Sequence, residues 1–173
     1  VLTSFCEGIG FLPAYVGEQL GARMLSGIGA KRLTRANGGY SIETTTGDTV
    51  AAQYVVIAMP TYAAANVLAD LDSNLCKVLA EIPYADMAVV CTGYTRDQIA
   101  HDVNGFGFLV PRSEGKRILG CLWTSSIFPH EAPDGSVLLR TMIGGSTDPD
   151  AVRLSDAELL DIVNREVHPL MRV

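Results

Sequence analysis

Three apolar, β-favouring runs in the second half of the chain constrain its fold more than any other feature. They cover residues 104–112, 117–129 and 137–145. Glu-Gly-Lys at 114–116 separates the first two runs, and Pro-Asp-Gly at 133–135 separates the last two. These residue types are typical of turns between strands. We therefore expect three successive strands that pair as an antiparallel meander.

The residues inside these runs resemble a known family. Residues 105–112 read Gly-Phe-Gly-Phe-Leu-Val-Pro-Arg, residues 118–129 read Ile-Leu-Gly-Cys-Leu-Trp-Thr-Ser-Ser-Ile-Phe-Pro, and residues 142–145 read Met-Ile-Gly-Gly. Taken in this order they resemble the middle of protoporphyrinogen oxidase, an FAD-dependent flavoprotein of haem and chlorophyll biosynthesis related to the amine oxidases. The resemblance extends from about Phe5 to the last residue, and it implies that the chain is an internal fragment of such an oxidoreductase.

Composition sets broad limits on location and partners. With 48% hydrophobic and 18% charged residues, the 173-residue chain suits one globular domain or two packed lobes. A net charge of -6 and scattered basic residues argue against nucleic-acid binding. No apolar run approaches the roughly 20 residues that span a bilayer. We expect a cytoplasmic protein; a peripheral position at a membrane and a homodimer are left open for the full-length protein.

The first half of the chain shows several local signals. A periodic apolar segment at residues 12–20, followed by Gly21, predicts a helix, and residues 23–26 predict a short strand. Residues 31–35 and 40–44 predict a hairpin because Asn and Gly between them tolerate positive φ. The apolar run at residues 54–60 predicts a strand buried on both faces, as in a parallel sheet, with a helix starting at Pro60.

Further elements are predicted after these. Residues 75–82 predict an amphipathic helix and residues 85–94 a strand, while Ser155 and Glu158 form a capping-box pattern ahead of a final helix. The expected fold is α+β or α/β: part of a flavin-binding lobe at residues 1–64, and a porphyrinogen-binding lobe at residues 65–173. The second lobe should hold a mixed, largely antiparallel sheet covered by helices.

The resemblance implies a flavin site that this chain completes only in part. It places flavin contacts at Ala30, Ala58, Met59 and Pro60. No Gly-x-Gly-x-x-Gly motif occurs in the sequence, so nothing predicts a helix N-terminus presented to a pyrophosphate. We therefore expect FAD to be the cofactor of the full-length protein and expect this chain alone not to hold it tightly.

The resemblance also implies a substrate site made of broad apolar walls. A porphyrinogen is a large, mostly apolar ring, and alternate residues of a strand can form one wall for it. The positions that match the family's substrate contacts are Phe106, Gly107, Leu109, Leu119, Leu122 and Met142. The implied reaction is stepwise hydride removal from protoporphyrinogen IX to the flavin, with oxygen as acceptor. No residue resembles a general base, so no catalytic residue is assigned.

The sequence assigns no firm binding or metal-ligand role to its arginines and cysteines. Arg112 and Arg140 are only speculative partners for a substrate carboxylate, and Glu131 lies where relatives often carry an arginine. Cys6, Cys76, Cys91 and Cys121 lack metal-ligand spacing, and we expect reduced, buried thiols and no metal.

Alternatives to this function stay open. They are a coproporphyrinogen oxidase, another amine-oxidase-like flavoprotein such as an amine oxidase or carotenoid desaturase, and a non-enzymatic tetrapyrrole-binding or interaction module.

Overall fold

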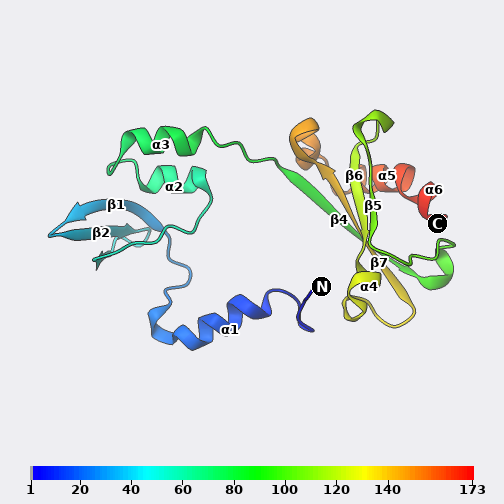
Figure 1. Ribbon diagram of the computed structural model, residues 1–173, viewed down its shortest axis with the longest axis horizontal. Helices are drawn as coiled ribbons and strands as arrows, with labels where there is room; N and C mark the ends of the chain where they lie inside the picture. The colour runs from blue at the N-terminus through cyan, green and yellow to red at the C-terminus, as the bar shows by residue number, and fades with distance from the viewer. Residues whose placement is uncertain (1) are drawn as a thin grey trace. The chain divides into compact units, whose positions relative to one another are not determined.

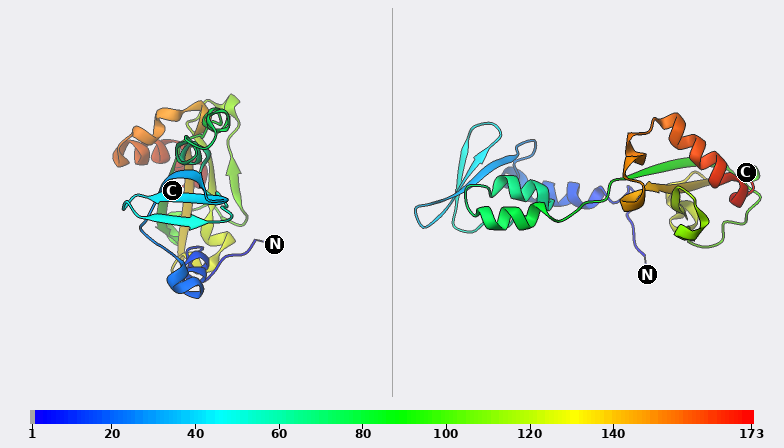
Figure 2. Two further views of the ribbon diagram at one scale, coloured as in Figure 1. Left: turned by 90° about the vertical axis from the view of Figure 1, so that its left-hand side faces the viewer. Right: turned by 90° about the horizontal axis from the view of Figure 1, so that it is seen from above.

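Residues 2–173 are described by a computed structural model, and they form two compact units. The N-terminal unit is Val16–Tyr84, and the C-terminal unit is Ala85–Val173 together with the segment that ends at Tyr15. Figures 1 and 2 show the elements of each unit. The predicted boundary at residue 64 falls inside helix α2 (Thr61–Val67), which packs on strand β1 (Ala30–Ala36) of the N-terminal unit. The assignment of residues 1–64 and 65–173 to two functional lobes stays a prediction.

The chain begins with helix α1 (Phe11–Leu20), as the sequence predicted. It ends at Leu20, and the φ of +53° at the following residue, Gly21, suits a glycine just after a helix. A 3-10 turn, Gly21–Arg23, follows. The strand predicted at residues 23–26 is wrong, because these residues form turns and irregular backbone between two glycines with positive φ, Gly21 and Gly27.

A three-stranded antiparallel sheet forms the centre of the N-terminal unit. Its order is β1, β2 (Gly39–Thr44) and β3 (Thr49–Ala52). The predicted hairpin is confirmed: Asn37 and Gly38 both have positive φ, +48° and +77°, as a tight hairpin turn with right-handed strand twist requires. Sequence chemistry at two turn residues thus determines the register of the first two strands.

Helices α2 and α3 (Ser73–Ala80) complete the N-terminal unit. Asp72 caps α3 because its carboxylate accepts the backbone N–H groups of Asn74 and Leu75, both at 3.0 Å. Leu33 of β1 packs with Val67 and Leu68 at the end of α2 to form a small buried core. The helices predicted after Pro60 and at residues 75–82 are therefore confirmed, the second with an earlier start.

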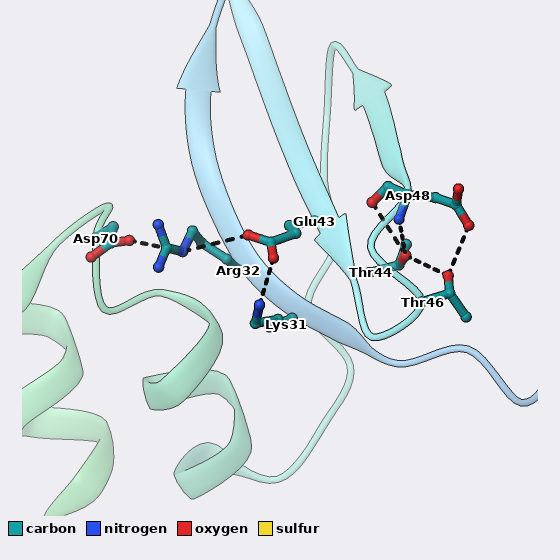
Figure 3. Close-up of polar contacts among 7 residues, drawn as sticks. All are labelled: Lys31, Arg32, Glu43, Thr44, Thr46, Asp48 and Asp70. Atoms are coloured by element: carbon teal, nitrogen blue, oxygen red, sulfur yellow. Dashed lines mark hydrogen bonds and ion pairs between the residues drawn. The ribbon is translucent and has the colours of Figure 1, made fainter.

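Surface ion pairs tie the sheet of this unit to the chain after α2. Figure 3 shows Arg32 between Glu43 of β2, at 3.8 Å, and Asp70, at 3.1 Å, while Lys31 lies 2.6 Å from Glu43. The bond from Lys31 is the main reason why the pKa of Glu43 lies below its ordinary value. Because these side chains are 34–60% exposed to solvent, each pair adds little to stability.

The strand predicted at residues 54–60 is wrong. The run is extended but forms no strand, and the side chains of Tyr54 and Val56 are 87% and 90% exposed. Val55 and Ile57 pack against the small core, so only alternate residues turn inward. A strand buried on both faces needs hydrogen-bonded neighbours on either side, and residues 2–173 place none beside this run.

A four-stranded antiparallel sheet dominates the C-terminal unit (Figure 1). Its order is β4 (Met87–Thr95), β7 (Ser136–Gly144), β6 (Ile118–Trp123) and β5 (Gly107–Leu109). The predicted meander β5-β6-β7 is confirmed, and β4 adds to its β7 edge. The strand predicted up to residue 129 ends earlier, because α4 (Thr124–Ile127) follows β6 directly. Short 3-10 turns lie at Arg96–Gln98, Arg112–Glu114, Pro129–Glu131, Gly145–Thr147 and Pro149–Arg153.

Two helices cover one face of this sheet. They are α5 (Asp156–Glu166) and α6 (His168–Met171), seen beside the strands in Figures 1 and 2. Leu139 and Ile143 of β7 are fully buried against Val163 and Val167. The predicted capping box is confirmed, since the Ser155 hydroxyl accepts the Glu158 backbone N–H and the Glu158 carboxylate accepts the Ser155 backbone N–H.

A polar network holds the start of β6 to α5 and to the turn after β7. The Glu166 carboxylate accepts the backbone N–H groups of Arg117 and Ile118, at 3.0 and 3.1 Å. The Arg117 guanidinium donates two hydrogen bonds to Asp148, at 2.7 and 3.0 Å, which is a bidentate pair. These bonds, with some opposing desolvation, raise the pKa of Arg117 above its ordinary value.

None of the helices within residues 2–173 has the length and apolar character needed to cross a bilayer.

Candidate functional site

The four-stranded sheet has one face that α5 and α6 do not cover, and we call it the open face. Residues paired in register across strands point to the same side of a sheet, so the pairing defines this face. One row runs from Val89 through Met142 and Gly120 to Leu109, and the next from Cys91 through Arg140 and Leu122 to Gly107. Met87, Gly93 and Leu138 extend the face along β4 and β7.

The open face gathers most of the residues predicted for the porphyrinogen site. Gly107, Leu109, Leu122 and Met142 come from three strands and lie in its two rows. Leu109 is 78% exposed, whereas Leu122 and Met142 are half-buried by their neighbours. Their substrate contacts stay a prediction, but the fold brings residues 35 positions apart in sequence onto one surface.

Phe106 and Leu119 lie at irregular positions beside these rows. Phe106 directly precedes β5, has an exposed side chain, and accepts the Trp123 backbone N–H at 3.0 Å. Leu119 is the extra residue of a bulge in β6, where the register with β7 shifts between Ile118 and Gly120. The structure therefore places both residues outside the two rows that define the open face.

The backbone conformation and the neighbouring strand both require a glycine at position 107. Its φ is +135°, and a Cβ atom built there would lie 2.1 Å from the carbonyl oxygen of Cys121 on the neighbouring strand. The sequence interpretation used Gly107 to let a ring approach the backbone. The geometry adds a structural reason, since any side chain would break the pairing of β5 with β6.

Sequence reasoning missed the contribution of β4 to this face. Met87 and Val89 have exposed side chains on it, and Cys91 is exposed as well. The signal was present, because the three residues are two apart in an apolar strand and therefore share a side. The expectation that Cys91 is buried is wrong: its run pairs with β7, but its side chain points away from the helices.

The other three cysteines are also free thiols, and they differ in how far they are buried. Cys121 is buried among the core residues and receives a hydrogen bond from Thr141 at 3.6 Å. Burial raises the pKa of its thiol. Cys76 is half-buried and Cys6 is exposed, so burial holds for only one of the four. Within residues 2–173 no group of three or more His, Cys, Asp or Glu side chains could hold a metal ion.

The predicted flavin contacts all lie in the N-terminal unit. Ala30 begins β1, whereas Ala58, Met59 and Pro60 form the turn that leads into α2. Met59 lines an open cavity of about 400 Å³ between the sheet and the helices, with Leu33, Tyr40, Val55, Ile57, Thr61, Ala64, Leu68, Leu71, Leu75 and Leu79. At its rim the Thr61 backbone N–H donates to the Tyr84 hydroxyl at 3.0 Å, which lowers the pKa of Tyr84.

These residues fit only part of a flavin cofactor. The cavity lining is apolar and contains no basic side chain, so it suits an uncharged surface and cannot neutralise a pyrophosphate. The sequence also has no glycine-rich turn that leads from a strand into a helix. This cavity therefore has no group suited to hold the phosphates of FAD, and the contacts of Ala30, Ala58, Met59 and Pro60 with the cofactor stay predictions.

Comparison with known proteins supports the resemblance seen in the sequence. Residues 3–172 match the family model for flavin containing amine oxidoreductases. The chain is 33% identical to the chloroplastic protoporphyrinogen oxidase of Oryza sativa subsp. japonica, over 98% of this chain and 34% of the rice protein. It is 29% identical to coproporphyrinogen III oxidase of Bacillus subtilis, over 87% of this chain and 32% of that protein.

Solved structures confirm the mixed α+β fold with antiparallel sheets. A crystal structure of a protein from Exiguobacterium sp. 255-15 superposes with a TM-score of 0.80 at 23% identity, over 97% of this chain and 36% of that one. An oxidoreductase from Methanosarcina mazei gives a TM-score of 0.64 at 18% identity. The chain thus spans about a third of the length of these proteins. It belongs to the flavin-containing amine oxidoreductase family, and its relatives include proteins named as porphyrinogen oxidases.

Proposed function

We propose that this protein is the central part of an FAD-dependent oxidase that converts protoporphyrinogen IX to protoporphyrin IX with oxygen as acceptor. The observation that carries the proposal is the open face, where apolar side chains of four strands form one exposed wall. In a monomeric domain such a surface usually marks a binding site. The chain's part in the reaction is to hold the macrocycle.

The wall suits a flat, apolar ligand. Leu109, Val89 and Met142 present aliphatic or thioether side chains in one row, and the buried Gly120 between Met142 and Leu109 adds no side chain to it. If a ring covers on the order of 400 Å² of apolar surface, the gross gain is about 10 kcal/mol. Ordering and association costs remove a large share of this gain, and the remainder supports binding without an ion pair.

The chemistry of the proposed reaction belongs to the cofactor. A bound flavin supplies the electron-accepting group, while the protein binds and orients the substrate. The strand positions of the open face in β4, β5, β6 and β7 include no carboxylate or imidazole that could act as a general base. The residues described here therefore contribute the shape of the site and the exclusion of water from it.

A ligand titration tests the proposal. Trp123 is the only tryptophan and lies on β6, one residue after Leu122 of the wall. Saturable quenching of its fluorescence by protoporphyrin IX is expected, in the low micromolar range that corresponds to roughly 8 kcal/mol. The control is Leu109→Asp, because this largely exposed residue can change without disturbing the core.

Weaker quenching in Leu109→Asp would support a ligand on the open face. Equal affinity of Leu109→Asp and the unchanged protein would contradict it. Oxidation of protoporphyrinogen IX by the full-length protein with FAD, followed by porphyrin fluorescence, tests the reaction itself. Turnover of an amine or a carotenoid instead would favour another branch of the family, and binding without FAD-dependent turnover would favour a non-enzymatic module.

A coproporphyrinogen oxidase is the second candidate. It is favoured by the similarity to the Bacillus subtilis protein named coproporphyrinogen III oxidase, which covers 87% of this chain. Parallel assays with protoporphyrinogen IX and coproporphyrinogen III separate the two, and the substrate with the higher kcat/KM identifies the reaction. A homodimer and a peripheral membrane position stay proposals for the full-length protein.

A further inference from the structure

We propose that Arg140 binds a carboxylate of the ligand on the open face, and that Glu131 competes with that carboxylate. This inference rests on the proposed function, since it names the group of the macrocycle that the face recognises. The ligand class is an apolar ring that carries carboxylates at its edge. Arg140 then acts as a specificity-determining residue within an otherwise apolar wall.

Arg140 is the only charged residue among the strand positions of the open face. Its cross-strand partners are Cys91 on β4 and Leu122 on β6, and its neighbours on β7 are Leu138 and Met142. These strand neighbours supply no charge to Arg140, and its one ionic partner, Glu131, lies outside the strands. An apolar ligand with an acidic group would supply apolar contacts to these neighbours and a negative charge to Arg140.

The existing partner of Arg140 leaves most of its donors available. Its Nη2 atom lies 3.6 Å from an Oε2 atom of Glu131, which is within range for an ion pair but too long for a hydrogen bond. The Arg140 side chain is 42% exposed. A guanidinium has five N–H donors in a fixed fork that matches a carboxylate, so Arg140 can bind a second carboxylate bidentately.

Arg117, in the same unit, is an arginine whose hydrogen bonds serve the fold, and it provides a comparison for Arg140. It donates two hydrogen bonds to Asp148, at 2.7 and 3.0 Å, and its pair ties two elements together. Arg140 has no comparable bond within residues 2–173, and its one ion pair reaches a short 3-10 turn, Pro129–Glu131. The difference separates an arginine used for folding from one available to a ligand.

Glu131 affects the same site through its charge. Its carboxylate is mostly shielded, with a side chain 22% exposed, and lies beside the guanidinium that a ligand would use. A second carboxylate brought to Arg140 is repelled by Glu131, and partial burial weakens the screening by solvent and salt. Removing the charge of Glu131 should therefore tighten the binding of an acidic ligand.

The test compares protoporphyrin IX with its dimethyl ester, using quenching of Trp123 in the unchanged protein and in variants. The free acid should bind roughly tenfold more tightly than the ester, because a hydrogen bond to a charged group is lost in the ester. Arg140→Met should remove this preference, Arg140→Lys should restore part of it, and Glu131→Gln should strengthen it. Arg112→Met, an exposed arginine outside the open face, is the matched control and should change neither affinity.

The outcomes separate this inference from the proposed function. Binding of both porphyrins with no loss of preference in Arg140→Met would overturn the role of Arg140 and leave the open face as the site. Weaker acid binding in Glu131→Gln would overturn the competition between Glu131 and the ligand. Binding of neither porphyrin by the unchanged protein would overturn the proposed function and this inference with it. Urea unfolding of each variant checks the fold, and Arg140→Lys and Glu131→Gln keep the test decisive if Arg140→Met does not fold.

Discussion

The two compact units bury their apolar residues to different degrees. The C-terminal unit closes a core in which Leu139, Ile143, Val163 and Val167 have no exposed surface. The core cluster of the N-terminal unit is smaller, with Leu33, Val67 and Leu68, and an apolar cavity lies open beside it. The C-terminal sheet packs along one face on α5 and α6 and closes a complete core, whereas the N-terminal sheet with α2 and α3 closes its interior only in part. The C-terminal unit therefore offers a rigid base for a binding wall.

The largest expected effect is a difference between two matched core substitutions. Leu139→Ala should destabilise the C-terminal unit by about 3–4 kcal/mol, because it leaves a cavity in a fully packed core. Leu68→Ala should cost the N-terminal unit about 1–2 kcal/mol, because Leu68 already borders an open cavity that the change only enlarges. Urea unfolding followed by Trp123 fluorescence measures the first, and amide hydrogen exchange in β1 and β2 measures the second. An equal or larger cost for Leu68→Ala would contradict the comparison.

A smaller effect is expected at the edge of the open face. Gly107→Ala should lower the free energy of unfolding of the C-terminal unit by about 2 kcal/mol, since a Cβ would meet the Cys121 carbonyl oxygen and φ is +135°. Gly93→Ala is the control, because nothing lies within 4 Å of a Cβ at that position of β4. Amide exchange of β5 and β6 would locate the damage. A stable Gly107→Ala protein with protected β5 amides would show that the strand tolerates a side chain.

The smallest effect concerns the start of α5. Hydrogen bonds from the side chain and backbone of Ser155 lower the pKa of Glu158 from its ordinary value near 4.5. A depressed carboxylate pKa contributes stability above the unfolded value, and this contribution is lost as the pH falls through the folded value. Ser155→Ala should therefore raise the pKa of Glu158 and cost about 1 kcal/mol at neutral pH through the lost cap.

Proton NMR titration of Glu158, together with unfolding at pH 7 and pH 3, measures these changes. The stability difference between Ser155→Ala and the unchanged protein should shrink at the lower pH. Glu158→Gln is the control, since it removes the titration but keeps an acceptor for the Ser155 backbone N–H. An unchanged Glu158 pKa in Ser155→Ala would show that the capping box does not form in solution.

Local chemistry explains why much of the C-terminal unit could be predicted. The turns at residues 114–116 and 133–135 and the capping box each specify their own structure within a few residues. The same holds for Asn37 and Gly38 in the first hairpin. These elements were predicted correctly because their signals are local.

The predictions that failed depended on structural neighbours that are distant in the sequence. The run at residues 54–60 is apolar enough for a buried strand, but a strand needs neighbours, and composition does not say whether they are present. Cys91 was expected in the core because its run is apolar on both sides of the strand. Only the pairing with β7 shows which side the helices cover, and the same pairing adds Met87 and Val89 to the open face.

The most direct test of the open face as the porphyrin site uses its own thiol. Cys91 lies exposed in the row with Arg140 and Leu122, and Cys6 is an exposed thiol that belongs to none of the four strands. The rate of alkylation of each by iodoacetamide can be followed by mass spectrometry, with and without protoporphyrin IX. We expect the porphyrin to slow the labelling of Cys91 severalfold and leave Cys6 unchanged. Unchanged labelling of Cys91, at a porphyrin concentration that saturates the quenching of Trp123, would show that the ligand binds elsewhere.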